Sequence, residues 1–152
     1  MIIVFQRVER ASVTIDEEIT ARIGCGGVIL LGIERGDTRA DVSALVLKII
    51  GLRVFSGARP MDRGIIDTGG SLLVVSQFTL AARVDKGRRP SMELAEKPER
   101  AEPLYERFID EVRAQNVPVE SGRFGADMKV SLVNDGPVTL LLRARDGAVR
   151  CV

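Results

Sequence analysis

The hydrophobic positions of this chain fall into runs of two kinds, and each kind predicts a different element. Residues 1–15 are mostly apolar and β-branched, although their alternation breaks at Glu9-Arg10. Residues 26–33 form an unbroken apolar run after glycines, and residues 71–80, SLLVVSQFTL, carry the strongest signal of this kind in the chain. Short apolar runs rich in Val, Ile and Leu predict strands, and the unbroken ones predict strands buried on both faces.

Two other segments change to a helical period. After Asp37 or Thr38, either of which is a suitable N-cap, apolar residues recur every three or four positions until Gly51. A second helix is predicted over residues 97–116, where Pro98 suits the first turn. The apolar stripe of this second helix consists of Leu104, Phe108, Ile109 and Val112.

The remaining segments predict a hairpin, a short strand and loops. Residues 12–23 have the pattern of a hairpin that turns near Asp16, and residues 52–55, LRVF, predict a strand. Residues 56–70 and most of 81–97 are rich in turn formers and charges, which predicts loops.

The segment NDGP, residues 134–137, interrupts a strand-like pattern near the end of the chain. Apolar residues run up to Val133 and resume at Val138, yet proline cannot donate a hydrogen bond to a neighbouring strand. A turn between two strands is the simpler interpretation. A cis peptide bond before Pro137 is the alternative, since cis bonds occur mainly before proline.

The order of elements is therefore strands, helix, strands, helix, strands. This order predicts an α/β fold: one β-sheet-rich domain over residues 1–152, with two helices covering the sheet. Because two helices leave much of such a sheet uncovered, we expect a contact between copies in an oligomer.

Composition narrows the possible functions. Hydrophobic residues make up 45% of the chain and aromatic residues only 4%, so the core is expected to consist mainly of Val, Leu and Ile. The net charge of +1 excludes a strong global attraction to nucleic acid, and any such binding must come from local clusters of basic residues. No apolar run approaches the ~20 residues that span a bilayer, and the N-terminus lacks a signal-peptide pattern. We therefore expect a cytoplasmic protein without a membrane partner.

The absence of histidine removes the commonest catalytic side chain. The 152 residues contain no histidine and two cysteines, Cys25 and Cys151, which lie far apart. Catalytic Ser-His-Asp and Cys-His arrangements are therefore excluded, as are metal sites built on histidine. The cysteine spacing argues against a disulfide framework or a zinc site, and we expect no metal and no cofactor.

Three stretches are candidates for chemistry. In the first, a buried-strand pattern meets the polar residues of Ser76-Gln77-Phe78-Thr79. Catalytic groups concentrate at strand ends and adjoining loops, although a strand that simply leaves the core would give the same pattern. Ser and Thr hydroxyls are poor nucleophiles without a base.

The second stretch is a basic loop. Arg83, Lys86, Arg88 and Arg89 lie close together with one acidic residue, Asp85, among them. Such a loop is either a solvated charge cluster or a phosphate contact, because arginine suits anionic oxygens. The third stretch, residues 122–139, includes the NDGP segment and two glycines that allow close approach of the backbone.

Taken together, these motifs resemble the bacterial type of the D-aminoacyl-tRNA deacylase family. The motifs SQFTL, KGRRPS, GRFGADM and NDGPVT occur here in the order in which that family has them. The resemblance extends from QRVERASV near the start to VNDGPVTLLL near the end, and is weakest at SGARPMDRGIIDTGG and in the tail RARDGAVRCV.

The resemblance implies a homodimeric esterase that acts on the aminoacylated 3′ end of tRNA. Such an enzyme hydrolyses the ester of D-aminoacyl-tRNA, and of glycine on the wrong tRNA, and spares L-aminoacyl esters. It further implies that Gly136-Pro137 forms a cis peptide that enters the active site of the other subunit. The enzyme would then reject L-aminoacyl esters because the L side chain collides with this rigid backbone.

The resemblance also assigns roles to the candidate residues. The backbone N–H groups of Phe78 and Thr79 would form an oxyanion hole, with Ser76 and Gln77 shaping the pocket. The alternative is that the Thr79 hydroxyl acts as the nucleophile or orients the attacking water. The acceptor-stem phosphates would be held by Lys86, Arg88 and Arg89, and the terminal base by Phe124 and Met128. Two rival interpretations remain open, namely a non-enzymatic RNA-binding module and a structural β-rich dimer without a ligand.

Overall fold

One α/β domain forms the part of the chain that the structure, a computed structural model, describes, which is residues 1–85 and 87–151. The strands are β1 (Ile2–Ile15), β2 (Glu18–Ile23), β3 (Gly26–Gly32), β4 (Ser71–Ser76), β5 (Val119–Ser121), β6 (Lys129–Arg145) and β7 (Ala148–Cys151). The helices are α1 (Arg39–Gly51), the short α2 (Ile65–Thr68), the 3-10 turn η1 (Phe78–Ala81) and α3 (Pro98–Ala114).

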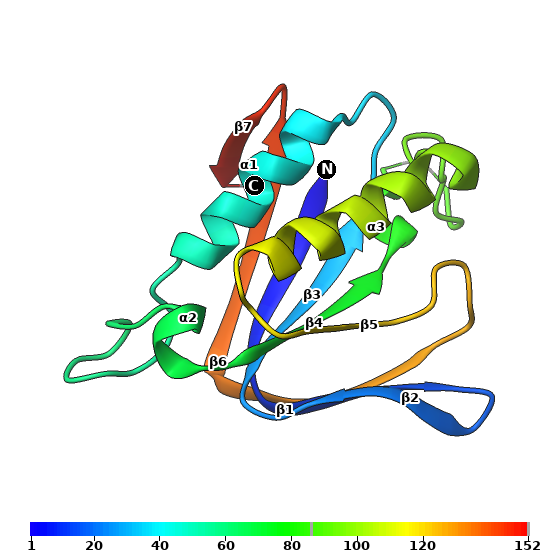
Figure 1. Ribbon diagram of the computed structural model, residues 1–152. Helices are drawn as coiled ribbons and strands as arrows, with labels where there is room; N and C mark the ends of the chain where they lie inside the picture. The colour runs from blue at the N-terminus through cyan, green and yellow to red at the C-terminus, as the bar shows by residue number, and fades with distance from the viewer. Residues whose placement is uncertain (86, 152) are drawn as a thin grey trace.

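The strands form a mixed seven-stranded sheet in the order β5-β4-β3-β1-β6-β7, with β2 pairing to β1. The β3–β4 and β4–β5 pairs are parallel, and the other pairs are antiparallel. Helices α1 and α3 lie across one face of this sheet (Figure 1). The predicted fold class of one sheet-rich α/β domain with two covering helices is confirmed. The association of two chains into a dimer stays a prediction.

Two local predictions are wrong. Residues 52–55 do not form a strand, since Phe55 makes only an isolated bridge to Arg63. Both backbone groups of Phe55 are instead used by the loop that follows it, because its N–H donates to the Arg63 carbonyl and its carbonyl accepts from the N–H groups of Asp62 and Arg63. The loop predicted over 56–70 contains the helical turn α2, in which Ile65 is buried.

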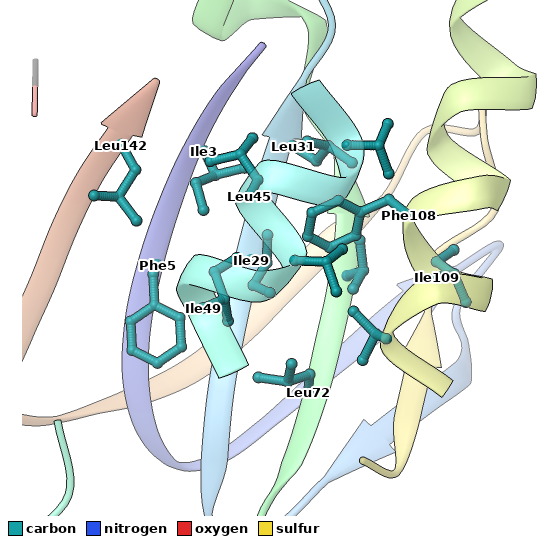
Figure 2. Close-up of a cluster of buried hydrophobic side chains, with 14 of the residues drawn as sticks. Ile3, Phe5, Ile29, Leu31, Leu45, Ile49, Leu72, Phe108, Ile109 and Leu142 are labelled. Atoms are coloured by element: carbon teal, nitrogen blue, oxygen red, sulfur yellow. The ribbon is translucent and has the colours of Figure 1, made fainter. Parts of the chain in front are cut away.

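The main core lies between the helices and the sheet. Alternate residues of β1 and β3, such as Phe5 and Ile29, point toward the helices, and Leu45 of α1 and Phe108 of α3 meet them. Figure 2 shows these side chains interleaved between the sheet and the two helices. Phe108 and Leu45 have no exposed surface, which explains why the apolar residues of both helical patterns fall on one face.

The sheet covers part of its own second face. Beyond a break in register between Val8 and Arg10, β1 bends, and its second half carries β2 over the lower part of β3 and β4 (Figure 1). This bend encloses a second core of buried residues: Val8, Ala11, Val13, Ile15, Ala21, Ile23, Val28, Leu73 and Val75. The broken alternation at Glu9-Arg10 in the sequence marks this bend.

Asp41 joins the start of α1 to the turn between β6 and β7. Its buried carboxylate accepts hydrogen bonds from the Thr38 N–H (2.8 Å), the Thr38 hydroxyl (3.0 Å) and the Gly147 N–H (2.9 Å). Burial by itself raises the pKa of Asp41, but these hydrogen bonds outweigh it and hold the pKa below the usual 3.8.

Asp41→Asn is therefore expected to lower the free energy of unfolding at pH 7 by about 1.5–3 kcal/mol, the range for hydrogen bonds to a charged group. Because the pKa of Asp41 is lowered in the folded state, its contribution is fully present above the usual pKa of 3.8 and is lost progressively as the pH falls below 3.8 through the lower pKa of the folded state. Urea unfolding at pH 7 and pH 3.5 measures both effects. The exposed Asp127→Asn is the matched control, and equal midpoints for the two variants at pH 7 would contradict this role.

Candidate active site

The end of β4 turns abruptly into the 3-10 turn η1. The Gln77 N–H still donates to the Leu31 carbonyl of β3 (2.8 Å), and the Leu80 N–H then closes a turn onto the Gln77 carbonyl (3.1 Å). Gly32 permits this packing, since a Cβ there would lie 2.8 Å from the Cβ of Leu80. The prediction of a strand through residue 80 is therefore wrong beyond Ser76, because the chain leaves the β3 ladder at this point.

The turn presents two neighbouring backbone amides. The first N–H groups of a helix have no acceptor within it, and Phe78 and Thr79 are the first two residues of η1. In residues 1–85 and 87–151, no backbone carbonyl accepts a hydrogen bond from either N–H. Phe78 is 61% exposed and Thr79 is exposed as well, so the two residues that carry these amides lie on an open surface.

Gln77 positions the side chain of Thr79. The Gln77 Nε2 donates a hydrogen bond of 2.6 Å to the Thr79 Oγ1. This is the only hydrogen bond of Oγ1 to a side chain among the described residues, and an amide N–H cannot remove a proton from a hydroxyl. The arrangement suits a fixed polar group beside two amides better than it suits an activated nucleophile. Ser76, at the end of β4, is half-buried.

The basic loop is held together by one of its own arginines. Arg83 makes two hydrogen bonds to Asp85, at 2.7 and 3.1 Å, and one to Glu93 at 3.0 Å, and its backbone pairs with Ser91. The hydrogen bonds from Arg83 lower the pKa of Asp85. The positive charge of Arg83 is thus neutralised by two carboxylates of the same loop.

The two arginines at the tip of this loop differ from Arg83. Arg88 and Arg89 are exposed, and neither forms an ion pair with any carboxylate in the described part of the chain. Lys86, predicted to act with them, lies outside the described residues.

Phe124 and Met128 follow β5 but contribute to different clusters. The Phe124 ring lies 5.6 Å from that of Tyr105, and both line a cavity of about 390 Å³ beside α3. Met128 packs instead against the second core and touches Gly122. The Tyr105 hydroxyl lies within hydrogen-bond distance of the carbonyls of Val74 (2.9 Å) and Gly122 (3.1 Å) and shares its single proton between them, which fixes this segment next to β4. Burial raises the pKa of Tyr105 far above its usual value, so the hydroxyl remains a donor.

The NDGP segment is a bulge rather than a turn. Strand β6 pairs with β1 on both sides of it, with Val8 opposite Asn134 and Gln6 opposite Thr139. Four residues of β6 therefore stand opposite Arg7 alone, and Gly136 and Pro137 are exposed on this bulge.

The peptide bond before Pro137 is trans, because no peptide bond between described residues is cis. The expectation of a cis Gly136-Pro137 bond, which came with the family resemblance, is therefore wrong for this structure. Gly136 instead adopts a φ of 109°, a conformation that glycine tolerates. The backbone of β6 thus changes direction through the extra residues of the bulge. The trans isomer is also the more stable one for an ordinary X-Pro bond.

Arg7, which lies opposite the bulge on β1, holds the bulge in place. It was not among the predicted site residues. Its Nε lies 2.8 Å from the Asp135 Oδ2, and its Nη1 donates to the Val54 carbonyl at 2.5 Å. Its side chain is only 11% exposed, and a Cβ on Gly136 would come within 2.5 Å of its Nη2. The only sequence signal that could have indicated Arg7 is a charged residue within the strand-like run of residues 1–8.

Within one protomer, the turn at residues 76–79 and the bulge at Gly136 lie far apart. Gln77 follows β4, whereas Gly136 lies on β6, and β3 and β1 separate these strands. Gln77 contacts Leu31, while Arg7, opposite the bulge, pairs with Gly27 at the other end of β3. With strands about 4.8 Å apart and a rise of about 3.3 Å per residue, the two segments are roughly 20 Å apart.

Two further features concern other classes of site. No helix in residues 1–85 and 87–151 is long and apolar enough to cross a membrane. Within the same residues, no three acidic or cysteine side chains gather in a way that would hold a metal ion, and Cys25 is exposed with a free thiol.

Comparison with known structures identifies the same fold. The chain superimposes on a structure titled "c-Myc DNA Unwinding Element Binding Protein" with a TM-score of 0.90 and 41% identity, covering 95% of this chain and 99% of the other. A structure titled as a probable eukaryotic D-amino acid tRNA deacylase matches with a TM-score of 0.74 over 92% of this chain and 97% of the other. At 17% identity, this second match concerns the fold alone.

Sequence comparison gives the family. The family profile described as D-Tyr-tRNA(Tyr) deacylase matches residues 4–143. A D-aminoacyl-tRNA deacylase of Shewanella amazonensis is 53% identical over 144 residues, and one of Escherichia coli O1:K1 / APEC is 49% identical. Each match covers 94% of this chain and 99% of the relative. The chain therefore belongs to the D-aminoacyl-tRNA deacylase family.

Proposed function

We propose that this chain is a D-aminoacyl-tRNA deacylase, an ester hydrolase that releases the D-amino acid from the 3′-terminal adenosine of tRNA. The observation that carries this function is the identity of 53% and 49% to deacylases over 94% of the chain. We further propose that it removes glycine from tRNAs that should not carry it, that it leaves L-aminoacyl esters intact, and that it works in the cytoplasm without a cofactor.

The two amides of η1 are the proposed oxyanion hole. The N–H groups of Phe78 and Thr79 are adjacent and have no backbone acceptor in the described part of the chain, so they are available to the developing oxyanion of the ester carbonyl. One well-aimed donor is worth about 10²–10³ in rate. An aminoacyl ester is already reactive, and water with the ribose 2′-hydroxyl would carry the proton. Gln77, through Thr79, shapes the pocket, and Ser76 anchors it at the end of β4.

The exposed bulge of one subunit is the proposed source of chiral selection in the other. Gly136 and Pro137 present main-chain atoms, and the contacts of Arg7 with Asp135 and Val54 make the bulge rigid. A rigid backbone facing the α-carbon would collide with an L side chain, whereas a D side chain would point away and glycine has none. This mechanism uses the trans bulge as it stands.

A homodimer is needed for this mechanism. The separation of roughly 20 Å between Gly136 and Gln77 in one protomer supports a site shared by two copies. The upper part of the sheet face opposite the helices also carries a row of neighbouring apolar side chains, Leu30, Val4 and Leu141. Leu141 is 42% exposed, so this row is a suitable apolar contact for a second copy.

The basic loop and the segment after β5 are the proposed contacts for tRNA. Arg88 and Arg89, with Lys86, would hold acceptor-stem phosphates, and Phe124 and Met128 would flank the terminal base. Since Phe124 lines the cavity beside α3 and Met128 does not, Phe124 is the stronger candidate for stacking.

The double variant Arg88→Ala/Arg89→Ala is expected to bind tRNA with a shallower dependence on salt. Each lost phosphate contact should reduce the slope of log K against log salt by about 1. Titrations between 50 and 300 mM KCl, about the range where such slopes are measured, test this. The control is Arg39→Ala/Lys48→Ala on α1, which removes the same charge elsewhere. A slope equal to that of the wild type would remove the two arginines from the RNA contact.

Hydrolysis of D-Tyr-tRNA and L-Tyr-tRNA tests the function itself. A deacylase releases tyrosine from the D-ester and leaves the L-ester at its spontaneous rate. Binding of both tRNAs without release of either amino acid would instead identify an RNA-binding module. Equal release from both esters would contradict the proposed selectivity.

A further inference from the structure

We propose that a second basic surface, on the ribbon formed by β2, the second half of β1 and the first half of β6, binds phosphates of the tRNA acceptor stem. We define the ribbon face by its outward residues: Arg10, Ser12, Arg22, Lys129 and Ser131. This inference rests on the proposed function, because it assumes that aminoacyl-tRNA is the substrate. It adds a contact that the motifs in the sequence did not indicate.

The register of the three strands places these residues on one face. Ser12 is opposite Arg22 on one side and Ser131 on the other, so the three form one row across the ribbon. Lys129 pairs with Thr14, which lies two residues from Ser12 and therefore on the same face. The intervening residues of β1 point to the second core.

The ribbon face is hollowed as well as basic. A groove of about 390 Å³ is lined by Arg10, Ala11, Ser12, Arg22, Ser131, Leu132 and Val133. Two guanidinium groups and two hydroxyls therefore meet in one open groove. Arginine and serine are frequent donors to phosphate oxygens, and they need no particular base sequence.

The positive charge of the ribbon face is largely uncompensated. In residues 1–85 and 87–151, neither Arg22 nor Lys129 lies within ion-pair distance of a carboxylate, and Arg10 has only a 3.7 Å contact with Glu9. Such a surface attracts a polyanion. A second copy of the chain is a poor occupant, because a two-fold contact here would place these cations opposite their own copies.

The groove adjoins the bulge that we propose to enter the partner's active site. Val133, at one end of the groove, directly precedes Asn134, and Arg10 pairs with Val133. In a shared site, the ribbon face of the subunit that supplies Gly136 would lie beside the ester bound at Phe78 of the other. One subunit would then hold the tRNA by its basic loop and the other by its ribbon face.

The test compares two substrates in the variant Arg10→Gln/Arg22→Gln. D-Tyr-tRNA contains the acceptor stem, whereas D-tyrosyl-adenosine contains only the terminal nucleoside and no stem phosphates. We expect the ratio of kcat/KM for D-Tyr-tRNA to that for D-tyrosyl-adenosine to fall about tenfold, and the salt slope for D-Tyr-tRNA to become shallower by about 2. Arg10→Lys/Arg22→Lys, which keeps both charges, should restore most of the ratio. Arg39→Gln/Lys48→Gln should not change it.

An unchanged ratio of kcat/KM values and an unchanged salt slope would overturn the inference. Dissociation of the dimer in the Gln variant would overturn it as well, because the ribbon face would then be a contact between copies. If the wild type cleaves neither substrate, the proposed function fails instead. Because Arg10 and Arg22 are exposed, the variant is expected to fold, and an unfolding midpoint equal to that of the wild type checks this.

Discussion

A proline in place of Phe78 is expected to lower the rate of D-aminoacyl-tRNA hydrolysis by about 10²–10³ relative to alanine at the same position. Proline removes the backbone N–H that we assign to the oxyanion hole, whereas alanine keeps it, and both remove the aromatic ring. Phe78 is the first residue of η1, a position where proline is well tolerated because that N–H has no helical partner. The pair of variants therefore isolates one hydrogen-bond donor.

Single-turnover hydrolysis of D-Tyr-tRNA by Phe78→Pro and Phe78→Ala measures the difference. The loss should appear in the rate constant at saturating enzyme, since the donor acts on the transition state rather than on binding. The variant Thr79→Ala keeps both amides and should therefore retain most of the wild-type rate of D-Tyr-tRNA hydrolysis. Equal rates for the proline and alanine variants, or trapping of an acyl group on Thr79, would exclude the oxyanion-hole assignment.

Replacement of Gly136 by alanine is expected to lower the same rate by about 10²-fold, because displacement of a positioning group by about 1 Å has effects of that size. Gly136 has a φ of 109°, and its new Cβ would lie 2.5 Å from the Arg7 Nη2 and 3.1 Å from a methyl group of Val138. Arg7 cannot move aside freely, since Asp135 and the Val54 carbonyl hold it. The bulge must therefore shift, and discrimination against the L-ester should weaken with it.

Gly147→Ala separates this effect from backbone strain. Gly147 also has a positive φ, of 73°, but lies in the turn between β6 and β7. Both variants should lose about 1–3 kcal/mol of stability, the cost of a strained residue. Only Gly136→Ala should lose activity and stereoselectivity, and normal selectivity in that variant would mean that the bulge does not screen the substrate.

The periods of the hydrophobic pattern predicted most of the elements. Both long helices were identifiable because their buried residues recur on one face, and the order of elements fixed the fold class. The bend of β1 was visible only as a broken alternation at Glu9-Arg10, since folding of a sheet onto itself depends on contacts with β3 and β4. Residues 52–55 have the composition of a strand but no neighbouring strand to pair with.

The candidate site was predictable in part. The motif at Ser76–Thr79 was located from its polar residues at a strand end, but its turn depends on Gly32 of β3, far away in sequence. The bulge at Gly136 appears as a turn in the sequence, because only the pairing of β1 with both halves of β6 distinguishes the two. The expected cis bond came from resemblance rather than from the residues themselves, and the structure has the trans isomer.

In the proposed dimer, each active site combines η1 of one subunit with the Gly136 bulge of the other. Mixing Phe78→Pro with Gly136→Ala, under conditions that exchange subunits, tests it directly. Each mixed dimer would contain one intact site, formed by the unaltered η1 of one chain and the unaltered bulge of the other. Because about half of the dimers are mixed, and each has one intact site of two, we expect recovery of about one quarter of the wild-type rate. No recovery, although mixed dimers are present, would contradict it.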